Sequence, residues 1–263
     1  MSDIDKIVAL LSSDAVDKRI AAIIVLGELR PKGAPVVEAL ANVLSSGVPA
    51  LQRHALDALA KIGARRATRA ILPLLGVRDD DVRRAAVAAL VSVGDDVLPV
   101  VRARMAEAPN EANAPASGGP WSRADERRSV DAVLAALGGK DAFHALLEGL
   151  AAGDVETAKA AAIAVRQQVR DADARQRRAY LAETEKFLER AAKRGGPPGG
   201  LAAGIKILGY LEDRRALPTL LAFARDHDRP SAVRQEALIA LRFLTAGDGT
   251  RERGQDKAIA ATL

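Results

Sequence analysis

Residues 79–96 read DDDVRRAAVAALVSVGDD, and this stretch decides the fold. Three acids precede two arginines, a run of small and aliphatic residues follows, and a glycine and two more acids close it. Ala86, Leu90 and Val93 are spaced four and three residues apart, so one face of a helix carries all three. The stretch therefore predicts an amphipathic helix with an acidic start.

The same spacing recurs along the chain, with a leucine or valine anchor that corresponds to Leu90. Successive anchors are separated by 33, 31, 44, 31, 43 and 33 residues. A period of this length indicates a repeated helical unit. The anchors are Leu26, Leu59, Leu90, Leu134, Val165, Leu208 and Leu241.

The two long gaps contain insertions rich in glycine, proline and alanine. One covers residues 109–121 and includes EANAPASGGPW, and the other, residues 194–200, reads RGGPPGG. Such composition marks loops, and we expect residues 109–120 and 195–200 to be mobile. Removing about ten residues from each gap restores the period.

A second apolar segment precedes each anchor helix, as in VVEALANVL and LPTLLAFA. One helix pair cannot bury two apolar faces alone, so neighbouring pairs must stack. The sequence therefore predicts an all-α fold, an α-solenoid of about seven antiparallel helix pairs. We expect it to span residues 1–245, with residues 246–263 a C-terminal tail or the start of a further repeat.

Composition agrees with this fold and narrows the classes of protein. Aromatic residues make up 3% of the chain, and cysteine is absent, which excludes disulfides and thiolate metal sites. The first residues, MSDIDK, lack a signal core, and no uncharged apolar stretch is long enough to span a membrane. We expect a cytoplasmic protein without a membrane partner, and the arginine-rich bias favours a bacterial one.

The pattern resembles the HEAT-repeat family over residues 3–245. The resemblance lies in the Leu-Pro of the first helices (Leu72-Pro73, Leu217-Pro218), the acidic turn, and the Val-Arg that opens the second helices (Val82-Arg83, Val233-Arg234). It implies an armadillo-like helical scaffold with a concave, helix-lined binding surface. It does not imply a particular activity.

The acids and arginines of the opening stretch have two interpretations. Acids at a helix start cap free N–H groups, and arginines one turn later can pair with them. Alternatively, basic residues at matching places form a row that binds a partner with an acidic surface or an acidic peptide. The residues of this predicted arginine row are Arg19, Arg53, Arg83, Arg127 and Arg234.

Nucleic-acid binding is the alternative function, because the isoelectric point is 9.7 and the net charge is +5. A binding face for nucleic acid needs a basic stripe, but no segment between insertions carries a net charge above +2. Stacking on single strands also needs aromatic residues, and the first 120 residues contain none.

An enzyme is the third alternative. The histidines are His54, His144 and His227, and none is followed by glutamate, whereas deoxyhypusine hydroxylases of HEAT type carry His-Glu pairs for iron. No H-E-x-x-H helix or G-x-S-x-G turn is present, so we expect no catalytic, metal or cofactor residues. The example of this alternative is a bilin lyase, an enzyme class that also uses such repeats.

Two further features concern partners. Trp121 is the only tryptophan; it either packs under its loop or anchors a partner, since tryptophan is common at binding hot spots. Ser122 and Asp125 after it have the spacing of a helix cap. The final residues, DKAIAATL, lack a polar cap, so we expect the chain to continue a longer solenoid or to dock on another subunit.

Together these features predict a non-catalytic scaffold for protein–protein interaction that uses a concave, helix-lined surface. The candidate contact residues are the arginine row and Trp121.

Overall fold

The part of the chain that the structure describes is helical. A computed structural model describes residues 2–31, 33–106, 122–151 and 155–246. Its ordered elements are α-helices and short 3-10 helices, which confirms the predicted all-α class. Trp121 and most of the tail lie outside the described residues, as does the insertion at residues 109–121. No helix in the described part is both long and apolar enough to cross a membrane.

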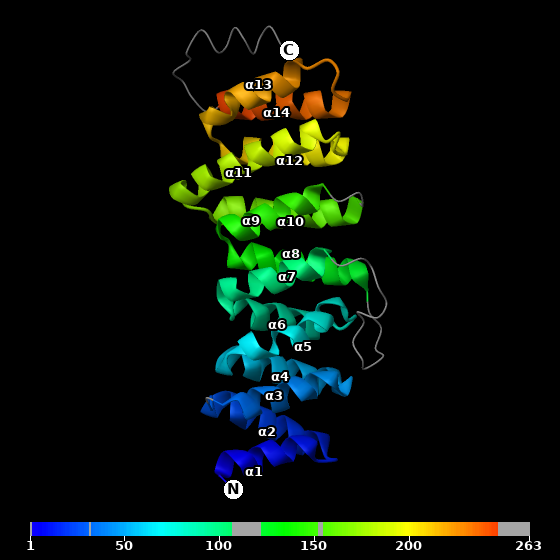
Figure 1. The fold of residues 1–263 in the computed structure, drawn as a ribbon, viewed down its shortest axis with the longest axis vertical. Helices are drawn as coiled ribbons and strands as arrows, with labels where there is room; N and C mark the ends of the chain where they lie inside the picture. Colours follow the sequence, from blue (N-terminus) through cyan, green and yellow to red (C-terminus); the bar gives the residue numbers. More distant parts are fainter. Residues whose placement is uncertain (1, 32, 107–121, 152–154, 247–263) are drawn as a thin grey trace. The chain divides into compact units, whose positions relative to one another are not determined.

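The chain divides into two compact units, residues 1–137 (unit 1) and 138–263 (unit 2), and each is described by itself. In unit 1, every first helix includes a 3-10 segment and is followed by a second, continuous α-helix, which gives four pairs (Figure 1). The pairs are α1 (Asp3–Ala9) and η1 (Leu10–Ser12) with α2 (Val16–Leu29); α3 (Ala34–Val43) and η2 (Leu44–Ser46) with α4 (Pro49–Ile62); η3 (Ala64–Ala67), α5 (Thr68–Ile71) and η4 (Leu72–Gly76) with α6 (Asp80–Val91); and η5 (Gly94–Val97) and α7 (Leu98–Ala106) with α8 (Arg123–Leu137).

Unit 2 holds three further pairs, so the described residues form the seven pairs that the period predicts. In these pairs the second helices also carry the anchors. The pairs are α9 (Gly139–Leu150) with α10 (Val155–Asp171); α11 (Ala174–Lys193) with α12 (Pro198–Leu211); and η7 (Arg214–Ala216) and α13 (Leu217–Arg225) with α14 (Ser231–Ala246).

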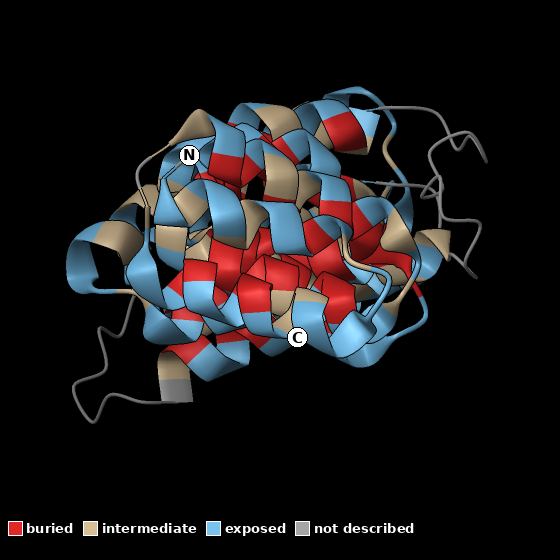
Figure 2. Ribbon diagram, turned by 90° about the horizontal axis from the view of Figure 1, so that it is seen from below, coloured by how far each residue is buried: buried red, intermediate tan, exposed pale blue. Residues whose placement is uncertain are grey.

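The predicted anchors form the centre of the core, and all seven are fully buried. Figure 2 shows buried residues on some sides of the helices and exposed residues on others. The residue four places before each anchor is small or valine and is also buried, which lets helices approach closely. At Gly204 a Cβ would lie 2.8 Å from Leu188 Cδ2, so any larger residue there would require the Leu188 side chain to shift.

The third stripe position is less buried in unit 1 than the sequence predicts. Leu29 is 56% exposed, and Val93 is only partly buried. The reason is that both residues stand at a helix end: α2 ends at Leu29, where Arg30 turns left-handed with φ 47°, and Val93 follows the C-cap of α6. A residue at a helix end has fewer neighbours to cover it.

The predicted insertion at residues 194–200 is a shorter loop than expected, because α12 already begins at Pro198. Proline suits a helix start, since its missing N–H has no partner in the first turn. Gly200 packs so closely that a Cβ would lie 2.7 Å from the carbonyl oxygen of Leu150. Much of the extra length of this repeat lies in α11, which has 20 residues.

The two Leu-Pro pairs have different structural effects. Pro218 lies in the first turn of α13, where a proline is tolerated. Pro73 falls within the first helix of the third repeat, and the chain there continues from α5 as the 3-10 helix η4. A proline inside a helix removes one backbone hydrogen bond, which explains the tighter segment.

Helix starts follow the predicted capping chemistry. The Asp79 carboxylate accepts hydrogen bonds from the backbone N–H groups of Asp81 and Val82, at 3.0 Å each. Ser2 and Asp5 form a reciprocal capping box, and Ser122 Oγ accepts a hydrogen bond from Asp125 N. The acids of the opening stretch therefore cap a helix, as the first interpretation expects.

Unit 1 also buries charged groups whose burial the sequence pattern does not predict. Arg104 Nη2 lies 2.6 Å from Glu126 Oε1, and both side chains are almost fully buried. On the same helix as Glu126, Asp131 lies 3.3 Å from Arg127 Nε. Burial raises the pKa of Asp131 to about 6, although the nearby Arg127 charge and hydrogen bond act to lower it.

The anchors yield a first prediction. Leu90→Ala should lower the free energy of unfolding by about 2–5 kcal/mol, and Leu90→Asp should lower it more, because it places an unpaired charge in the core. Urea unfolding measures both effects. Ala88→Asp, on the exposed side of α6, is the matched control and should change little. A Leu90→Asp variant as stable as wild type would contradict the repeat register.

Asp131 yields a prediction on pH. Its pKa is higher in the folded chain than in the unfolded chain, so the unfolded chain loses its proton first as pH rises. Relative to Asp131→Asn, the wild type should therefore lose about 3 kcal/mol of stability between about pH 4 and pH 6, and the difference should then stay constant. Urea unfolding at several pH values tests this. Asp57→Asn, at an exposed residue of α4, is the control for the substitution itself. A difference between wild type and Asp131→Asn that stays flat across this pH range would refute the raised pKa.

Candidate functional site

Four arginines of the predicted row occupy one position of the repeat, seven residues before the anchor. These arginines are Arg19, Arg83, Arg127 and Arg234, and each is partly buried. The Nε atoms of Arg19 and Arg234 are buried without a hydrogen-bond partner among the described residues, as is Nη2 of Arg127. Arg234 Nη1 lies 3.1 Å from His227 Nδ1. At this position of the repeat, the arginine side chains are thus mostly packed against the protein rather than extended into solvent.

Arg83 shows what this position does in its own repeat. Its Nη1 donates hydrogen bonds to the carbonyl oxygens of Val77 (2.6 Å) and Arg78 (2.9 Å), in the turn between η4 and α6. Its guanidinium also pairs with Asp80 and lies 3.9 Å from Asp125 of the next repeat. Arg83 therefore joins a hairpin turn to the neighbouring pair.

The charges around Arg83 balance one another. Arg84 pairs with Asp81, and Arg128 pairs with Asp125. Partial burial acts to raise the pKa of Asp125, but the hydrogen bond from Arg128 and the charge of Arg83 outweigh it and hold that pKa below its usual range. Acids and arginines line the same hollow of about 400 Å³ between α6 and α8, which leaves little unpaired charge for a ligand.

Arg53 differs from the other members of the row. It is exposed, because Gln52 occupies the place seven residues before the anchor and donates a 2.8 Å hydrogen bond to the Leu44 carbonyl oxygen. In the described part of unit 1, the row therefore consists of one exposed arginine and three that are partly buried. Trp121, the other predicted contact, lies outside the described residues.

A second candidate surface is formed by the sides of the second helices that face away from the core. On each second helix, the residues two places before and two places after the anchor face away from the core. In unit 1 these places hold small or charged residues after the first repeat, and Lys61 forms a 2.6 Å ion pair with Glu28 across α4 and α2. In unit 2 they hold Ile163, Gln167, Lys206, Tyr210, Ile239 and Phe243. We call this set, together with Arg166, the unit 2 face.

Large apolar groups are exposed on the unit 2 face. The exposed fractions are 68% for Ile163 on α10, 48% for Ile239 and 72% for Phe243, both on α14. The Arg166 guanidinium lies over the ring of Tyr210, 4.9 Å from its centroid. Aromatic and aliphatic groups beside an ordered arginine form the type of surface that protein partners cover.

Two hollows lie along this face, one lined by α10, α11 and α12 (about 440 Å³) and one between α12 and α14 (about 430 Å³). Tyr210 and Glu212 line both, so α12 forms the ridge that separates them. The approach of α12 to α14 is close, because a Cβ on Gly209 would lie 3.2 Å from Ala240 Cβ. The floor between these helices is therefore shallow.

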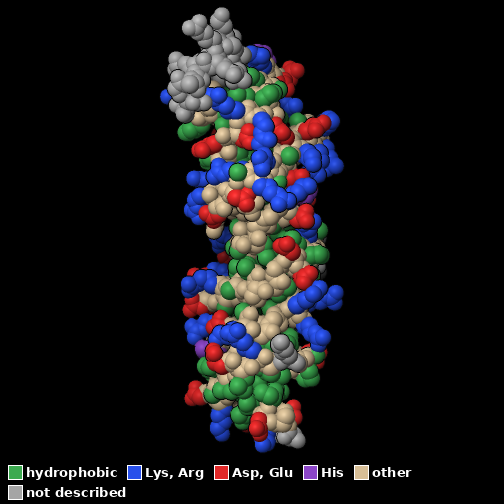
Figure 3. Space-filling model, turned by 90° about the vertical axis from the view of Figure 1, so that its left-hand side faces the viewer, with side chains coloured by type: hydrophobic (Ala, Val, Ile, Leu, Met, Phe, Trp, Pro, Cys, Tyr) green, Lys and Arg blue, Asp and Glu red, His purple; other side chains and the backbone are tan. Residues whose placement is uncertain are grey.

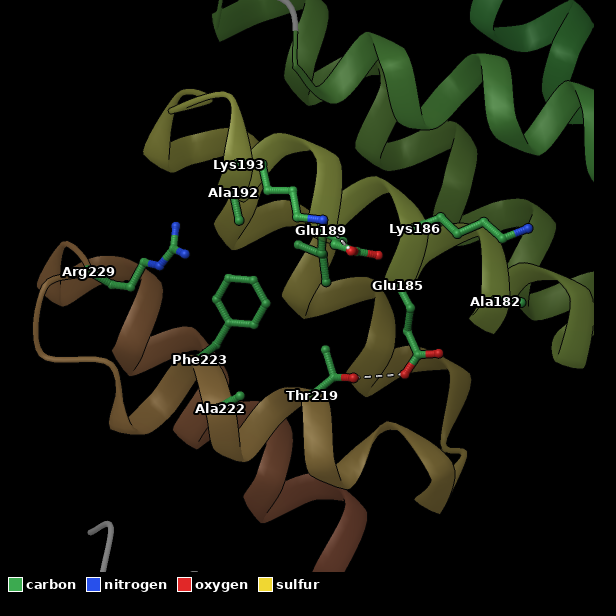
Figure 4. Close-up of a pocket in the computed structure, with 11 residues that line it drawn as sticks. Ala182, Glu185, Lys186, Glu189, Ala192, Lys193, Thr219, Ala222, Phe223 and Arg229 are labelled. Atoms are coloured by element: carbon green, nitrogen blue, oxygen red, sulfur yellow. Dashed lines mark hydrogen bonds and ion pairs between the residues drawn. The ribbon is translucent and has the colours of Figure 1, made fainter.

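A third hollow, of about 740 Å³, lies between the first helices α11 and α13 (Figure 4). Phe223 points from α13 toward α11, and Arg229 lies over its ring at 5.4 Å. The polar groups here satisfy one another: Thr219 Oγ1 donates to Glu185 at 2.8 Å, and Lys193 pairs with Glu189 at 2.7 Å. This groove offers a ligand fewer free groups than the unit 2 face does.

In the described part of the chain, neither the distribution of charged side chains nor the arrangement of potential metal ligands indicates a further site. On the face drawn in Figure 3, Lys and Arg side chains lie among Asp, Glu and hydrophobic ones. Among the described residues, no three His, Cys, Asp or Glu side chains gather in a way that could hold a metal ion. His144 lies between Glu183 and Glu148, at 3.2 and 3.4 Å, in a cluster that also includes Lys140.

The unit 2 face was not among the predicted sites, although the sequence contains a signal for it. Two places after the anchors, the residues run Glu28, Lys61, Ser92, Ala136, Gln167, Tyr210 and Phe243. This position faces solvent on an amphipathic helix, so large aromatic residues there are not explained by the core. The change from charged and small residues to aromatic ones marks the surface.

Comparisons with known proteins agree with the helical repeats. A sequence model of HEAT repeats matches residues 4–91 and again residues 37–114. No curated protein matches the chain.

Among solved structures, the chain is similar to the CpcE–CpcF complex of phycocyanin lyase from Nostoc sp. PCC7120, with 21% identity, 100% of this chain and 96% of that chain covered, and a TM-score of 0.42. Human deoxyhypusine hydroxylase is 18% identical over 92% of this chain and 96% of its own, with a TM-score of 0.34. Kap121p bound to Ste12p is 14% identical over 99% of this chain and 28% of its own, with a TM-score of 0.43.

Seven buried anchors at a fixed place in successive helix pairs, together with the match over residues 4–114, lead to one conclusion. The chain carries HEAT repeats over residues 4–114, and the helix pairs of unit 2 continue the same pattern of buried anchors.

Proposed function

We propose that the chain is a non-catalytic scaffold that binds another protein through the unit 2 face. The observation that carries this proposal is the exposure of Ile163, Ile239 and Phe243 on second helices of one unit. The free energy of the system falls when a partner covers exposed apolar groups, because their surface is removed from water. A HEAT-repeat fold supports a general role in protein interaction, and this face supplies a specific place for it.

Nucleic-acid binding is the competing function. The unit 2 face combines basic residues with Tyr210 and Phe243, and aromatic rings among cations can stack bases. One feature favours a protein instead: Ile163 and Ile239, which are exposed on this face, have no flat ring on which a base could stack.

The predicted arginine row and Trp121 remain the competing contact surface within the protein-binding proposal. The contacts of Arg83 and the partial burial of Arg19, Arg127 and Arg234 support a structural role for much of the row. Arg53 is the member whose exposure best suits binding. Mutation separates the two surfaces.

The test is affinity capture with the purified chain from an extract of its native cell, with and without nuclease. We expect the same protein partner to be captured after nuclease treatment. The double variant Ile239→Ser and Phe243→Ser should weaken capture by roughly tenfold or more, because it removes the apolar contact. Leu10→Ser, which changes an exposed leucine of η1, is the control and should capture normally.

Other results would support the alternatives. Capture that nuclease abolishes, or that falls steeply with salt, would indicate nucleic-acid binding and overturn the proposal. A coloured ligand that copurifies with the chain would favour the lyase-like alternative.

Arg83→Gln tests the structural role of the row. The variant loses hydrogen bonds to two backbone carbonyls and an ion pair, so we expect the free energy of unfolding to fall by about 1–3 kcal/mol. Capture of the partner by the folded variant should be unchanged. Arg53→Gln, on an exposed arginine, should change stability little. Loss of capture by Arg83→Gln without loss of stability would show instead that the row binds the partner.

A further inference from the structure

We infer that the unit 2 face binds an extended, acidic segment of a partner protein, with one apolar side chain in each of its two hollows. This inference rests on the proposed function and adds the chemistry of the partner. The two hollows have nearly equal volumes and share Tyr210 as their common wall. A segment that crosses the second helices therefore meets two hollows, each with an exposed aliphatic side chain and Tyr210 in its lining.

The apolar part of each hollow comes from a different helix. Ile163 on α10 lines the first hollow, and Ile239 and Phe243 on α14 line the second. These side chains are more exposed than ordinary core residues, so their apolar area is available to a ligand. A leucine-sized group in each hollow would cover an aliphatic side chain and one edge of Tyr210.

The charge of the face indicates an acidic partner. Arg166, Arg170, Arg177 and Lys206 line the two hollows, whereas the acids that line them are Glu212 and Glu236. No carboxylate in the described part of the chain forms an ion pair with Arg166 or Lys206, although Arg170 pairs with Asp171 at 3.0 Å. Two cations on neighbouring helices are thus free to bind carboxylates of a partner.

Arg166 is positioned for this role. Its guanidinium lies over the Tyr210 ring, which restricts its motion and leaves the planar fork of N–H groups open to solvent. An ordered arginine loses less side-chain entropy when it binds a carboxylate than a freely moving one does.

The spacing of the helices sets the spacing of the partner's residues. Packed helices lie about 8–10 Å apart. A polyproline II segment rises about 3.1 Å per residue and returns to the same side every three residues, so residues i and i+3 lie about 9 Å apart on one side. A segment with two apolar residues three apart, flanked by acids, therefore matches α10, α12 and α14 in succession.

The experiment uses the full chain and a fluorescein-labelled peptide of sequence Glu-Glu-Leu-Pro-Glu-Leu-Glu-Glu, followed by fluorescence anisotropy. We expect saturable binding that weakens with salt. Ile163→Ser, Phe243→Ser and Arg166→Gln should each raise the Kd by roughly tenfold, since each removes a contact at one hollow. Ile24→Ser is the matched control: Ile24 has the same place in the first repeat and is exposed, and the variant should bind as wild type does.

Control peptides test each part of the inference. A peptide with lysine in place of glutamate should not bind, and a peptide with adjacent leucines should bind more weakly than the original. Equal binding of the lysine peptide would overturn the acidic partner, and equal binding of the adjacent-leucine peptide would overturn the spacing. All substituted residues are exposed, and thermal melting of each variant checks that it is folded.

Other occupants of the face are outcomes that overturn the inference. A single-stranded oligonucleotide that displaces the peptide and binds more tightly would identify nucleic acid as the ligand. Sedimentation that shows a dimer of wild type but not of Phe243→Ser would identify a second copy of the chain. If the native partner is captured through Ile239 and Phe243 but the peptide does not bind, the proposed function stands and this inference fails.

Discussion

The fold depends on one constraint: a pair of short helices has more apolar surface than it can bury by itself. Each second helix carries an anchor that must contact both its own first helix and the next pair. The anchors meet this demand, since all seven are fully buried. The small residues that precede them allow the helices to approach, and at Gly204 even a Cβ would collide with Leu188. Repetition of this contact builds each unit.

This constraint explains why periodicity predicted the helix pairs and where it stopped being informative. The anchor spacing follows from burial, which acts in the same way in every repeat. Leu29 follows the pattern in sequence but is exposed, because the helix ends there and no neighbour covers it. Similarly, Gly and Pro near residue 198 suggested a loop, although proline at a helix start and glycine at a close contact produce the same letters.

The candidate site was harder to predict, for a physical reason. The sequence placed most of the arginines of the row correctly at one position of the repeat. It could not show that the long side chain of Arg83 reaches back to the carbonyl oxygens of Val77 and Arg78, since this depends on the shape of the turn. Nor did it show that Gln52 occupies the equivalent place and leaves Arg53 exposed. Contacts that depend on turn geometry are not encoded in a spacing.

Positions whose residue type is not determined by helix stacking can differ between repeats. Residues two places from an anchor face solvent, so the stacking of helices does not determine their identity. In unit 1 such a place holds Lys61, which pairs with Glu28 and needs no partner. In unit 2 such places hold Tyr210, which is partly buried, and Phe243, which is 72% exposed and whose apolar area contributes no stability while water covers it. Because an exposed ring of this size does not stabilise the core, we propose that a partner covers it, and the cations Arg166 and Lys206 nearby are our reason for proposing an acidic partner.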